Sequence, residues 1–238
     1  MQIQVCLSPA LLPMYDLAGK TVVVTDVLRA TSTMVAALEI GVSNIIPVAS
    51  RAEASAFIGK EGFLVAGERD GIKVEGFDLG NSPLGLLAHR EDLQGKTLVM
   101  TTTNGTKALK ESAGADHIII GALNNASAVA KAVLPFEKDI LVVCAGWKNR
   151  VNLEDTLFAG ALNELLKNDV SIYGDAAIMS QQLFVAHQHN LFEAIKNATH
   201  YKRLKSHGIE DDIKHCMTMD SSDVVPIQIE ESIHSMNA

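Results

Sequence analysis

Short apolar runs alternate with segments of helical periodicity as far as residue 167. Residues 2–7 alternate polar and apolar positions, and the later runs are almost entirely apolar; the predicted strands are 2–7, 21–25, 44–48, 63–67, 97–101, 117–121 and 139–146. Apolar runs without alternation are typical of parallel strands covered on both faces. The intervening segments predict helices over 31–40, 50–59, 82–90, 107–114, 124–134 and 153–167.

This order of strands and helices predicts a three-layer α/β/α fold with a mixed or parallel central sheet. Residues 172–215 show helical periodicity and no convincing strand, so we expect a helical C-terminal region. Residues 224–229 predict one more strand, which we place at an edge of the sheet because Pro226 has no N–H to donate. No repeat or linker composition divides the chain, and we expect a single domain over 1–238.

Charge and composition limit the classes of partner. The chain is 47% hydrophobic and 20% charged, with a net charge of −8 and no basic run, which argues against binding nucleic acid. No apolar run reaches the length of a membrane span, and the N-terminus lacks the features of a signal peptide. The three cysteines, Cys6, Cys144 and Cys216, have no metal-type spacing. We expect a cytoplasmic protein, and a homodimer is compatible with the sequence.

The segment 63–83 contains an unusually long stretch without apolar periodicity. After the apolar run FLVAG it carries one arginine, several turn formers and four carboxylates: Glu68, Asp70, Glu75 and Asp78. A long ordered loop inside a compact domain is usually functional. Carboxylates this close together repel one another unless a cation lies among them. The alternative is an acidic, solvated surface loop.

Polar residues also follow the other predicted strands. In open α/β sheets ligands bind beyond the carboxyl ends of the strands. We call the polar segment that follows the carboxyl end of a strand its exit. The residues at the four exits are Asp26, Arg29, Thr31, Ser32 and Thr33; Glu68, Arg69, Asp70, Asp78, Asn81 and Ser82; Thr102 to Thr106; and Gly146, Trp147, Lys148, Arg150, Glu154 and Asp155. Each exit taken singly is also explained by helix capping, but four such exits together indicate one polar site.

The exit TTTNGT has the pattern of an anion-binding turn. A strand end, an Asn-Gly turn and a helix N-terminus together direct backbone N–H groups at one spot, which favours an anion. Thr102, Thr103 and Thr106 add hydroxyl donors beside Asn104 and Gly105. The segment lacks the GK[ST] of a Walker sequence. A plain turn with a threonine cap is the alternative.

The carboxylates at the exits are hard oxygen ligands. Mg²⁺ is usually held by one or two carboxylates together with water and substrate phosphate oxygens. An anion-binding turn beside such a cluster predicts metal-assisted phosphoryl chemistry. No histidine stands at an exit, which argues against zinc. We interpret the histidines of the C-terminal region as surface or packing residues: His187, His189, His200, His207 and His215.

A cysteine-dependent phosphatase is an alternative. Cys144 and Arg150 have the spacing at which a thiolate attacks phosphorus and an arginine binds the phosphate oxygens. The loop between them contains one glycine and the bulky Trp147, so a tight cradle of amides is difficult to form. Residue 151 is valine rather than a hydroxyl residue that would assist the leaving thiolate. We therefore interpret Cys144 as a small buried apolar residue.

Several segments, in order and at their spacing, resemble the 2-phosphosulfolactate phosphatase family. They are DVLRATST, GERDG, GFDLGNSP, TTTNGT, CAG to LED, GIEDDIKHC and DSSDVVP, and they span nearly the whole chain. The resemblance implies a Mg²⁺-dependent acid phosphatase that hydrolyses (R)-2-phospho-3-sulfolactate to 3-sulfolactate and phosphate. The partner would then be a small anionic organophosphate. In methanogens this step belongs to coenzyme M biosynthesis.

We assign roles to residues from the chemistry of each exit. The predicted catalytic residues are Asp26, Glu68 and Asp155, and the predicted metal ligands are Glu68, Asp78 and Glu154. The predicted substrate-binding residues are Arg29, Ser32, Asn81, Thr102, Thr103, Asn104, Gly105 and Thr106. The sequence does not show which exit cation binds the sulfonate, among Arg29, Arg69, Lys148 and Arg150.

Two mechanisms are compatible with these residues. Either Mg²⁺ activates an attacking water, or Asp26 attacks phosphorus and forms an aspartyl-phosphate. Leu28 stands where phosphatases of the haloacid dehalogenase type have a second aspartate, so we favour direct attack by water. A non-catalytic anion-binding module is the remaining alternative, but it gives no reason for several carboxylates around an anion.

Overall fold

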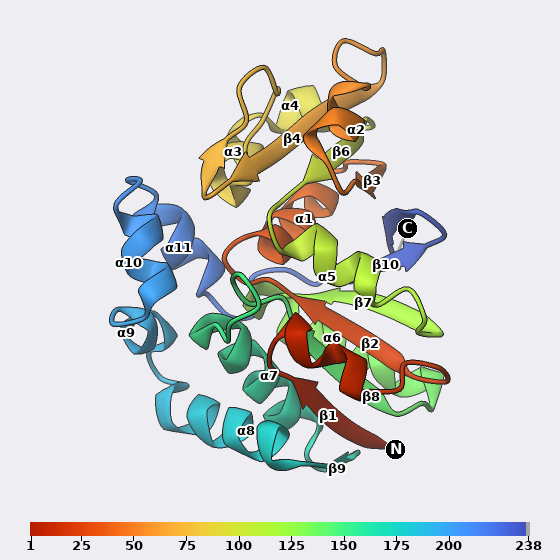
Figure 1. Ribbon diagram of the computed structural model, residues 1–238, viewed down its shortest axis with the longest axis vertical. Helices are drawn as coiled ribbons and strands as arrows, with labels where there is room; N and C mark the ends of the chain where they lie inside the picture. The colour runs from red at the N-terminus through yellow and green to blue at the C-terminus, as the bar shows by residue number, and fades with distance from the viewer. Residues whose placement is uncertain (237–238) are drawn as a thin grey trace.

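The chain folds around one mixed sheet in the strand order β5-β4-β6-β3-β11-β10-β7-β2-β8-β1-β9 (Figure 1). The structure is a computed structural model and describes residues 1–236. The strands are β1 Gln2–Cys6, β2 Thr21–Thr25, β3 Asn44–Pro47, β4 Phe63–Arg69, β5 Ile72–Lys73, β6 Thr97–Thr101, β7 His117–Gly121, β8 Ile140–Cys144, β9 Ser171–Ile172, β10 Pro226–Ile229 and β11 Ser232–Ser235. The seven strands predicted before residue 167 are all present.

Helices cover both faces of this sheet and confirm the three-layer α/β/α prediction (Figure 1). The α-helices are α1 Ala30–Glu39, α2 Arg51–Ser55, α3 Pro83–Ala88, α4 Arg90–Leu93, α5 Gly105–Glu111, α6 Ala126–Val133, α7 Leu153–Leu166, α8 Asp175–His187, α9 Leu191–Ile195, α10 Thr199–Lys205 and α11 Glu210–Cys216. Short 3₁₀ helices span Pro9–Met14, Leu123–Asn125 and Leu134–Phe136.

Strand β2 shows why a continuous apolar run indicates a strand covered on both faces. All five of its residues are buried. Val23 packs in the hydrophobic cluster that includes α6, α7 and α8, and Val22 and Val24 pack in the cluster that includes α1 and α5. Because successive side chains of a strand point to opposite faces, a strand between two helix layers needs apolar residues at every position.

The sheet consists of two parallel groups joined by a hairpin. Strands β1, β8, β2 and β7 run parallel, and so do β3, β6 and β4. The antiparallel hairpin β10–β11 lies between them, with Ile227 paired to Ile119 of β7 and Ile233 paired to Ile45 of β3. One hydrogen-bonded sheet therefore spans both halves of the described chain, and the single domain over 1–238 stays a prediction.

The hairpin overturns the prediction that residues 224–229 form an edge strand. Strand β10 lies inside the sheet, between β7 and β11. Pro226 is its first residue, and the pairing with β7 is made through Ile227. The N–H that proline lacks therefore falls at the beginning of the strand, where the ladder does not require it.

The region between β9 and β10 is helical, as predicted, and comprises α8 to α11. Helices α9, α10 and α11 lie at the left in Figure 1 and reach the end of the sheet where β2, β4 and β8 finish. Part of the long loop after β4 is ordered as a hairpin, with β5 antiparallel to β4 and left-handed backbone at Asp70 and Gly71. Within residues 1–236, no helix is both long enough and apolar enough to cross a bilayer.

Candidate active site

A narrow polar cleft lies beyond the carboxyl ends of the parallel strands. It is lined by residues that follow β2, β4, β6 and β8, and by helix α10, which belongs to the C-terminal region. The lining residues are Asp26, Leu28, Arg29, Glu68, Asp70, Gly71, Asn81, Thr103, Asn104, Trp147, His200, Arg203 and Leu204. The structure thus brings the four polar exits identified in the sequence to one place.

Asp26 is the first residue after β2 and is only 6% exposed. Its backbone N–H donates to Thr31 Oγ1 at 3.0 Å, which fixes the turn into α1. Burial raises the pKa of the Asp26 carboxyl to about 7; His200 lowers it, and the carboxylates of Glu68 and Glu154 raise it further. Asp26 is therefore balanced between its protonated and charged forms near neutral pH, and a cation beside it would favour the charged form.

Glu68 connects two of the exits. Its Oε1 accepts a hydrogen bond from the backbone N–H of Thr103 at 2.8 Å, and its Oε2 accepts one from Gly71 at 2.6 Å. Glu68 therefore holds the β4–β5 hairpin against the turn after β6. One of the amides predicted to bind an anion is already bonded to this carboxylate.

The TTTNGT turn is built by its own threonines. Thr106 N donates to Thr102 Oγ1 at 3.2 Å, and Thr106 Oγ1 donates to Thr102 O at 3.0 Å. These two side chains are buried and do not line the cleft, whereas Thr103 and Asn104 do. The Thr103 hydroxyl is buried without a partner. Of this turn, Thr103 and Asn104 are the residues placed to contact a ligand.

Gly105 allows the turn to approach Asp26 closely. A Cβ at this position would lie 2.5 Å from the Ala30 Cβ and 3.0 Å from Asp26 Oδ2. No side chain fits there without a shift of the chain. Gly105 was predicted to bind substrate, but the structure gives it the role of a spacer beside the Asp26 carboxylate.

Arg29 lies in the cleft, and its charge is neutralised by an ion pair with Asp212. It is buried, its Nη1 donates to Asp212 Oδ2 at 2.6 Å, and its Nη2 donates to the Gly71 carbonyl at 3.2 Å. The other carboxylate oxygen of Asp212 accepts from Ser82 Oγ and from Leu84 N. Asp212 of α11 therefore ties the beginning of α1 to the beginning of α3.

Asn81 and Ser32 were both predicted to bind substrate and have different surroundings. Asn81 lines the cleft, and its Oδ1 is buried without a partner. The Ser32 hydroxyl donates to the Val27 carbonyl at 2.9 Å and does not line the cleft. Ser32 shapes the turn after β2, and Asn81 offers an oxygen to the cleft.

Asp155 lies behind the cleft. Its two oxygens accept hydrogen bonds from Val27 N and Gly146 N, both at 2.9 Å. Burial raises the pKa of Asp155 well above its usual range, and the neighbouring carboxylates of Glu154 and Asp26 raise it further. Asp155 thus ties the exit of β2 to the exit of β8 and does not line the cleft.

Glu154 and His200 form a buried pair. Glu154 is 0% exposed and His200 is 5% exposed, and Glu154 Oε1 lies 2.5 Å from His200 Nδ1. The Asn152 amide nitrogen lies 3.1 Å from the same ring nitrogen. Glu154 Oε2 is buried without a partner. Because His200 lines the cleft while its Nδ1 faces Glu154, its Nε2 is the ring nitrogen left for a ligand.

This pair corrects the interpretation of the C-terminal histidines. His200 is a cleft residue, not a surface or packing residue. Its partner stands 46 positions earlier, so no local spacing in the sequence indicates the pair. Arg203 and Asp212 were likewise not assigned to the site from the sequence, and Trp147 was placed at the exit of β8 without a role.

Asp78, a predicted metal ligand, is not brought to the cleft. Its side chain is exposed, and its Oδ2 accepts a hydrogen bond from Val65 N at 2.8 Å. Val65 is the third residue of β4, whereas Glu68 stands near the carboxyl end of that strand. Asp78 therefore supports the β4 strand away from the cleft.

The oxygen donors of the cleft fit Mg²⁺ only with help from water or substrate. Within residues 1–236, no three side chains of His, Cys, Asp or Glu are arranged to hold a metal ion. Both oxygens of Glu68 accept backbone hydrogen bonds. The Asp26 carboxylate and the unpartnered Asn81 Oδ1 are hard donors in the cleft lining. This is the sparse donor set with which Mg²⁺ keeps several waters and binds phosphate oxygens.

The cysteine-dependent alternative is not supported by the geometry. Cys144 is fully buried inside β8 and does not line the cleft. Burial raises the pKa of its thiol well above the usual value, so the nucleophilic thiolate is disfavoured. Arg150 is exposed, and its backbone pairs with Trp147 across the turn after β8.

The fold and the cleft define an α/β enzyme whose polar site lies at the carboxyl ends of parallel strands. The chain matches the family described as 2-phosphosulpholactate phosphatase over residues 6–231. It is 43% identical over 215 residues to a protein of Caldanaerobacter subterraneus subsp. tengcongensis, covering 89% of this chain and 88% of that protein. It is 46% identical over 208 residues to a protein of Thermotoga petrophila, covering 87% and 88%.

A third relative, from Clostridium novyi, is 35% identical over 229 residues and covers 95% of this chain and 96% of its own. All three carry the name "Probable 2-phosphosulfolactate phosphatase". The chain belongs to this family, whose members are phosphoric monoester hydrolases. The resemblance stated from the sequence motifs is thereby confirmed.

Proposed function

We propose that this enzyme hydrolyses (R)-2-phospho-3-sulfolactate to 3-sulfolactate and phosphate in the cleft around Asp26, with Mg²⁺ as cofactor. The observation that carries the proposal is a buried carboxyl with a pKa of about 7 in a cleft that also contains two arginines and unpartnered polar groups. A carboxyl whose pKa is raised in this way is suited to exchange a proton during a reaction. The relatives named after this substrate support the choice of organophosphate.

Asp26 and Asn81 are the residues that would hold Mg²⁺ in the cleft, with Glu68 and Glu154 acting through water. When bound, Mg²⁺ would neutralise negative charge on the phosphoryl oxygens and lower the pKa of a bound water. The unpartnered Oδ1 of Asn81 and the unusually high pKa of Asp26 are both consistent with a cation between them. Thr103, with its free hydroxyl, and Asn104 would then contact the phosphate.

The proton transfers fall to Asp26 and His200. Asp26 accepts a proton from the water that attacks phosphorus, which retains the water-attack mechanism. As the bond from phosphorus to the sulfolactate oxygen breaks, Nε2 of His200 donates a proton to that oxygen. An alkoxide is a poor leaving group, so this proton lowers the barrier. Glu154 holds the ring through Nδ1, and Glu68 and Asp155 position the backbone around the site.

Phosphate release from (R)-2-phospho-3-sulfolactate, with and without Mg²⁺, tests the proposal. We expect turnover that disappears in EDTA and returns with Mg²⁺, and an Asp26→Asn enzyme at least about 10³-fold slower, because it loses a proton acceptor. Ser43→Ala, at an exposed serine between α1 and β3, is the matched surface control. Tight substrate binding without turnover would instead identify a non-catalytic anion-binding module.

The cytoplasmic location, the homodimer and the role in coenzyme M biosynthesis stay predictions. So does the absence of a nucleic acid partner, although the net charge of −8 is consistent with it.

A further inference from the structure

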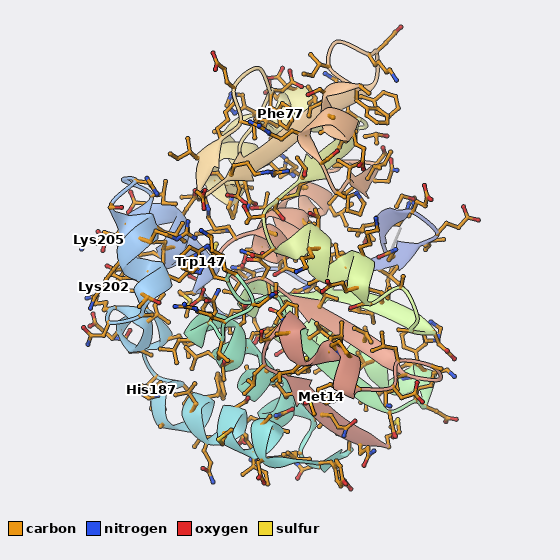
Figure 2. The ribbon with its side chains drawn as sticks, in the orientation of Figure 1. Met14, Phe77, Trp147, His187, Lys202 and Lys205 are labelled. Carbon is orange, nitrogen blue, oxygen red and sulfur yellow. The ribbon has the colours of Figure 1, made fainter. Side chains whose placement is uncertain are left out.

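One side of the cleft is formed by an arginine stacked on a tryptophan. Trp147 lies in the tight turn after β8, where Lys148 and Asn149 have left-handed backbone, and Arg203 lies on α10. The Arg203 guanidinium carbon is 4.8 Å from the centre of the Trp147 ring, and both residues line the cleft. In the view of Figure 2, Trp147 lies between the sheet and the C-terminal helices, and its side chain is half-buried.

Three nitrogen atoms of this pair are buried without hydrogen-bond partners. They are Nε and Nη1 of Arg203 and Nε1 of Trp147. A buried donor without an acceptor costs free energy, and a charged donor costs more. Within the described residues 1–236 no carboxylate forms an ion pair with Arg203. Three donor nitrogens at one side of a ligand cleft therefore require acceptors that the described chain itself does not supply.

The other cations near the cleft are already engaged or exposed. Arg29 is paired with Asp212, and Arg69 donates to the Glu68 carbonyl and to Thr101 Oγ1. Lys148 is exposed and lies 3.9 Å from Asp70 Oδ1. Arg150 is exposed on the turn after β8. Arg203 is thus the cleft cation best placed to meet an incoming anionic group.

We propose that Arg203 and Trp147 form a subsite for the sulfonate of the substrate, which rests on the proposed function. A sulfonate has three oxygens and a permanent negative charge, and the pair offers three unpartnered donor nitrogens and one positive charge. The indole ring holds the plane of the guanidinium by cation–π stacking. The phosphate lies on the Asp26 side of the cleft, so the subsite selects phosphate esters that carry a second, strongly acidic group.

The turn of the β4–β5 hairpin packs against α10 beside this subsite. A Cβ at Gly71 would lie 3.1 Å from Leu204 Cδ2 and 3.8 Å from Arg203 Nη1, so the turn between β4 and β5 packs directly against α10. Gly71 also has left-handed backbone and bonds both Glu68 and Arg29. The phosphate side and the sulfonate side of the cleft therefore share one rigid turn.

Binding can be measured without turnover because Trp147 is the sole tryptophan of the chain. We would titrate the purified protein with 3-sulfolactate, malate, lactate and inorganic phosphate and follow Trp147 fluorescence. 3-Sulfolactate should bind more tightly than malate, in which a carboxylate replaces the sulfonate, and much more tightly than lactate. Arg203→Ala should weaken 3-sulfolactate by about 10- to 100-fold, the range expected for hydrogen bonds to a charged group. Its affinity for phosphate should stay within about threefold.

Lys202→Ala is the matched control. It removes the same charge from the adjacent position of α10, but Lys202 is exposed and points away from Trp147 (Figure 2). We expect no change in 3-sulfolactate affinity for this variant. Arg203→Ala should melt near the temperature of the parent, because Arg203 is only half-buried and forms no ion pair with the described residues 1–236, whereas loss of a purely structural arginine would lower the melting temperature. Equal binding of malate and 3-sulfolactate would overturn the sulfonate assignment.

The kinetic arm compares 2-phosphosulfolactate with 2-phospholactate, in which a methyl group replaces the sulfomethyl group. Arg203→Ala should lower kcat/KM about 10- to 100-fold for the sulfonated substrate and less than about threefold for 2-phospholactate. An equal loss on both substrates would overturn the proposal and indicate a general role of Arg203 in catalysis. If neither substrate is turned over, the proposed function fails, and the fluorescence titration still decides whether the sulfonate subsite exists.

Discussion

His200 Nδ1 lies 2.5 Å from Glu154 Oε1, although the two residues belong to helices that are separated by much of the C-terminal region. Both side chains are buried, so the carboxylate fixes the orientation of the imidazole ring. A ring fixed in this way directs Nε2 into the cleft. The pair therefore adds an imidazole to a site whose predicted catalytic residues were all carboxylates, and this ring is the proton donor of the proposed mechanism.

The first prediction concerns the leaving group. His200→Gln should lower kcat about 10²- to 10⁴-fold on 2-phosphosulfolactate, whose alkoxide needs a proton. On p-nitrophenyl phosphate, whose phenolate leaves without one, the loss should be less than about tenfold. Steady-state kinetics on both substrates measure the difference. His187→Gln, at an exposed histidine on α8, should leave both rates unchanged. Equal losses on the two substrates would exclude His200 as the proton donor.

The second prediction concerns the dependence of stability on pH. Because burial raises the pKa of Asp26 from 3.8 to about 7, the native state keeps a proton that the unfolded chain releases above pH 4. The contribution of Asp26 to the free energy of unfolding therefore falls as pH rises from about 4 to about 7 and is constant above that. Asp26→Asn lacks this fall and should be more stable than the parent at pH 8, by up to about 4 kcal/mol.

Denaturant unfolding in EDTA at pH 4 and pH 8 measures this effect. At pH 4 the parent carries a protonated Asp26, so the two proteins should then differ by less than about 1 kcal/mol. Adding Mg²⁺ at pH 8 should stabilise the parent and leave Asp26→Asn unchanged, because the variant lacks the charged ligand. A variant that is less stable than the parent at pH 8 in EDTA would contradict the burial cost assigned to the charged Asp26.

The third prediction concerns Cys144. Since this thiol is buried in β8 and its pKa is raised, Cys144→Ala should retain at least about half of the parent kcat. The native enzyme should resist thiol-alkylating reagents, and EDTA should abolish its activity. Loss of all turnover in a folded Cys144→Ala enzyme, together with activity in EDTA, would restore the cysteine-dependent mechanism.

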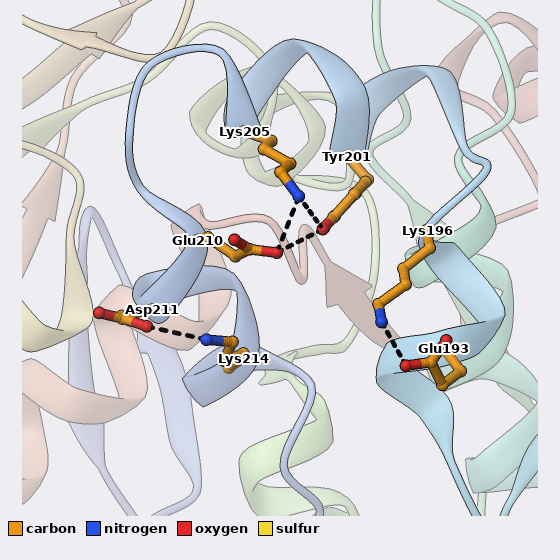
Figure 3. Close-up of polar contacts among 7 residues, drawn as sticks. All are labelled: Glu193, Lys196, Tyr201, Lys205, Glu210, Asp211 and Lys214. Carbon is orange, nitrogen blue, oxygen red and sulfur yellow. Dashed lines mark hydrogen bonds and ion pairs between the residues drawn. The ribbon is translucent and has the colours of Figure 1, made fainter.

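The fourth prediction concerns the buried ion pair between Arg29 and Asp212. Asp212→Asn leaves the Arg29 charge buried without its partner and should lower the free energy of unfolding by about 3–5 kcal/mol. Urea denaturation measures the change. The control is Lys214→Ala on the same helix, whose pair with Asp211 is exposed (Figure 3). An exposed pair of this kind is worth about 0–1 kcal/mol, so the control should be nearly as stable as the parent. Equal effects of the two variants would contradict the structural role of Asp212.

The fold and the general location of the candidate site were predictable from the sequence. Continuous apolar runs such as residues 21–25 identify strands buried on both faces, because burial on both sides excludes polar residues from every position. The polar residue after each run then marks the carboxyl edge of the sheet, as Asp26 and Glu68 do. These signals are local, because they depend only on the spacing of apolar residues along the sequence and on the residues at the ends of helices and strands.

The partners of these residues were decided by the tertiary structure. His200 and Arg203 are polar residues of α10 like the exposed Lys202 and Lys205, and no local pattern distinguishes them. Only the packing of α10 against the cleft brings them to Glu154 and Trp147. Asp78 is close to Glu68 in sequence, but the hydrogen bond that its carboxylate accepts from Val65 N holds it away from the cleft. The local sequence pattern determines which face of a helix or strand is apolar. Which distant side chains come into contact depends on how whole elements pack, and the sequence around each residue does not indicate that contact.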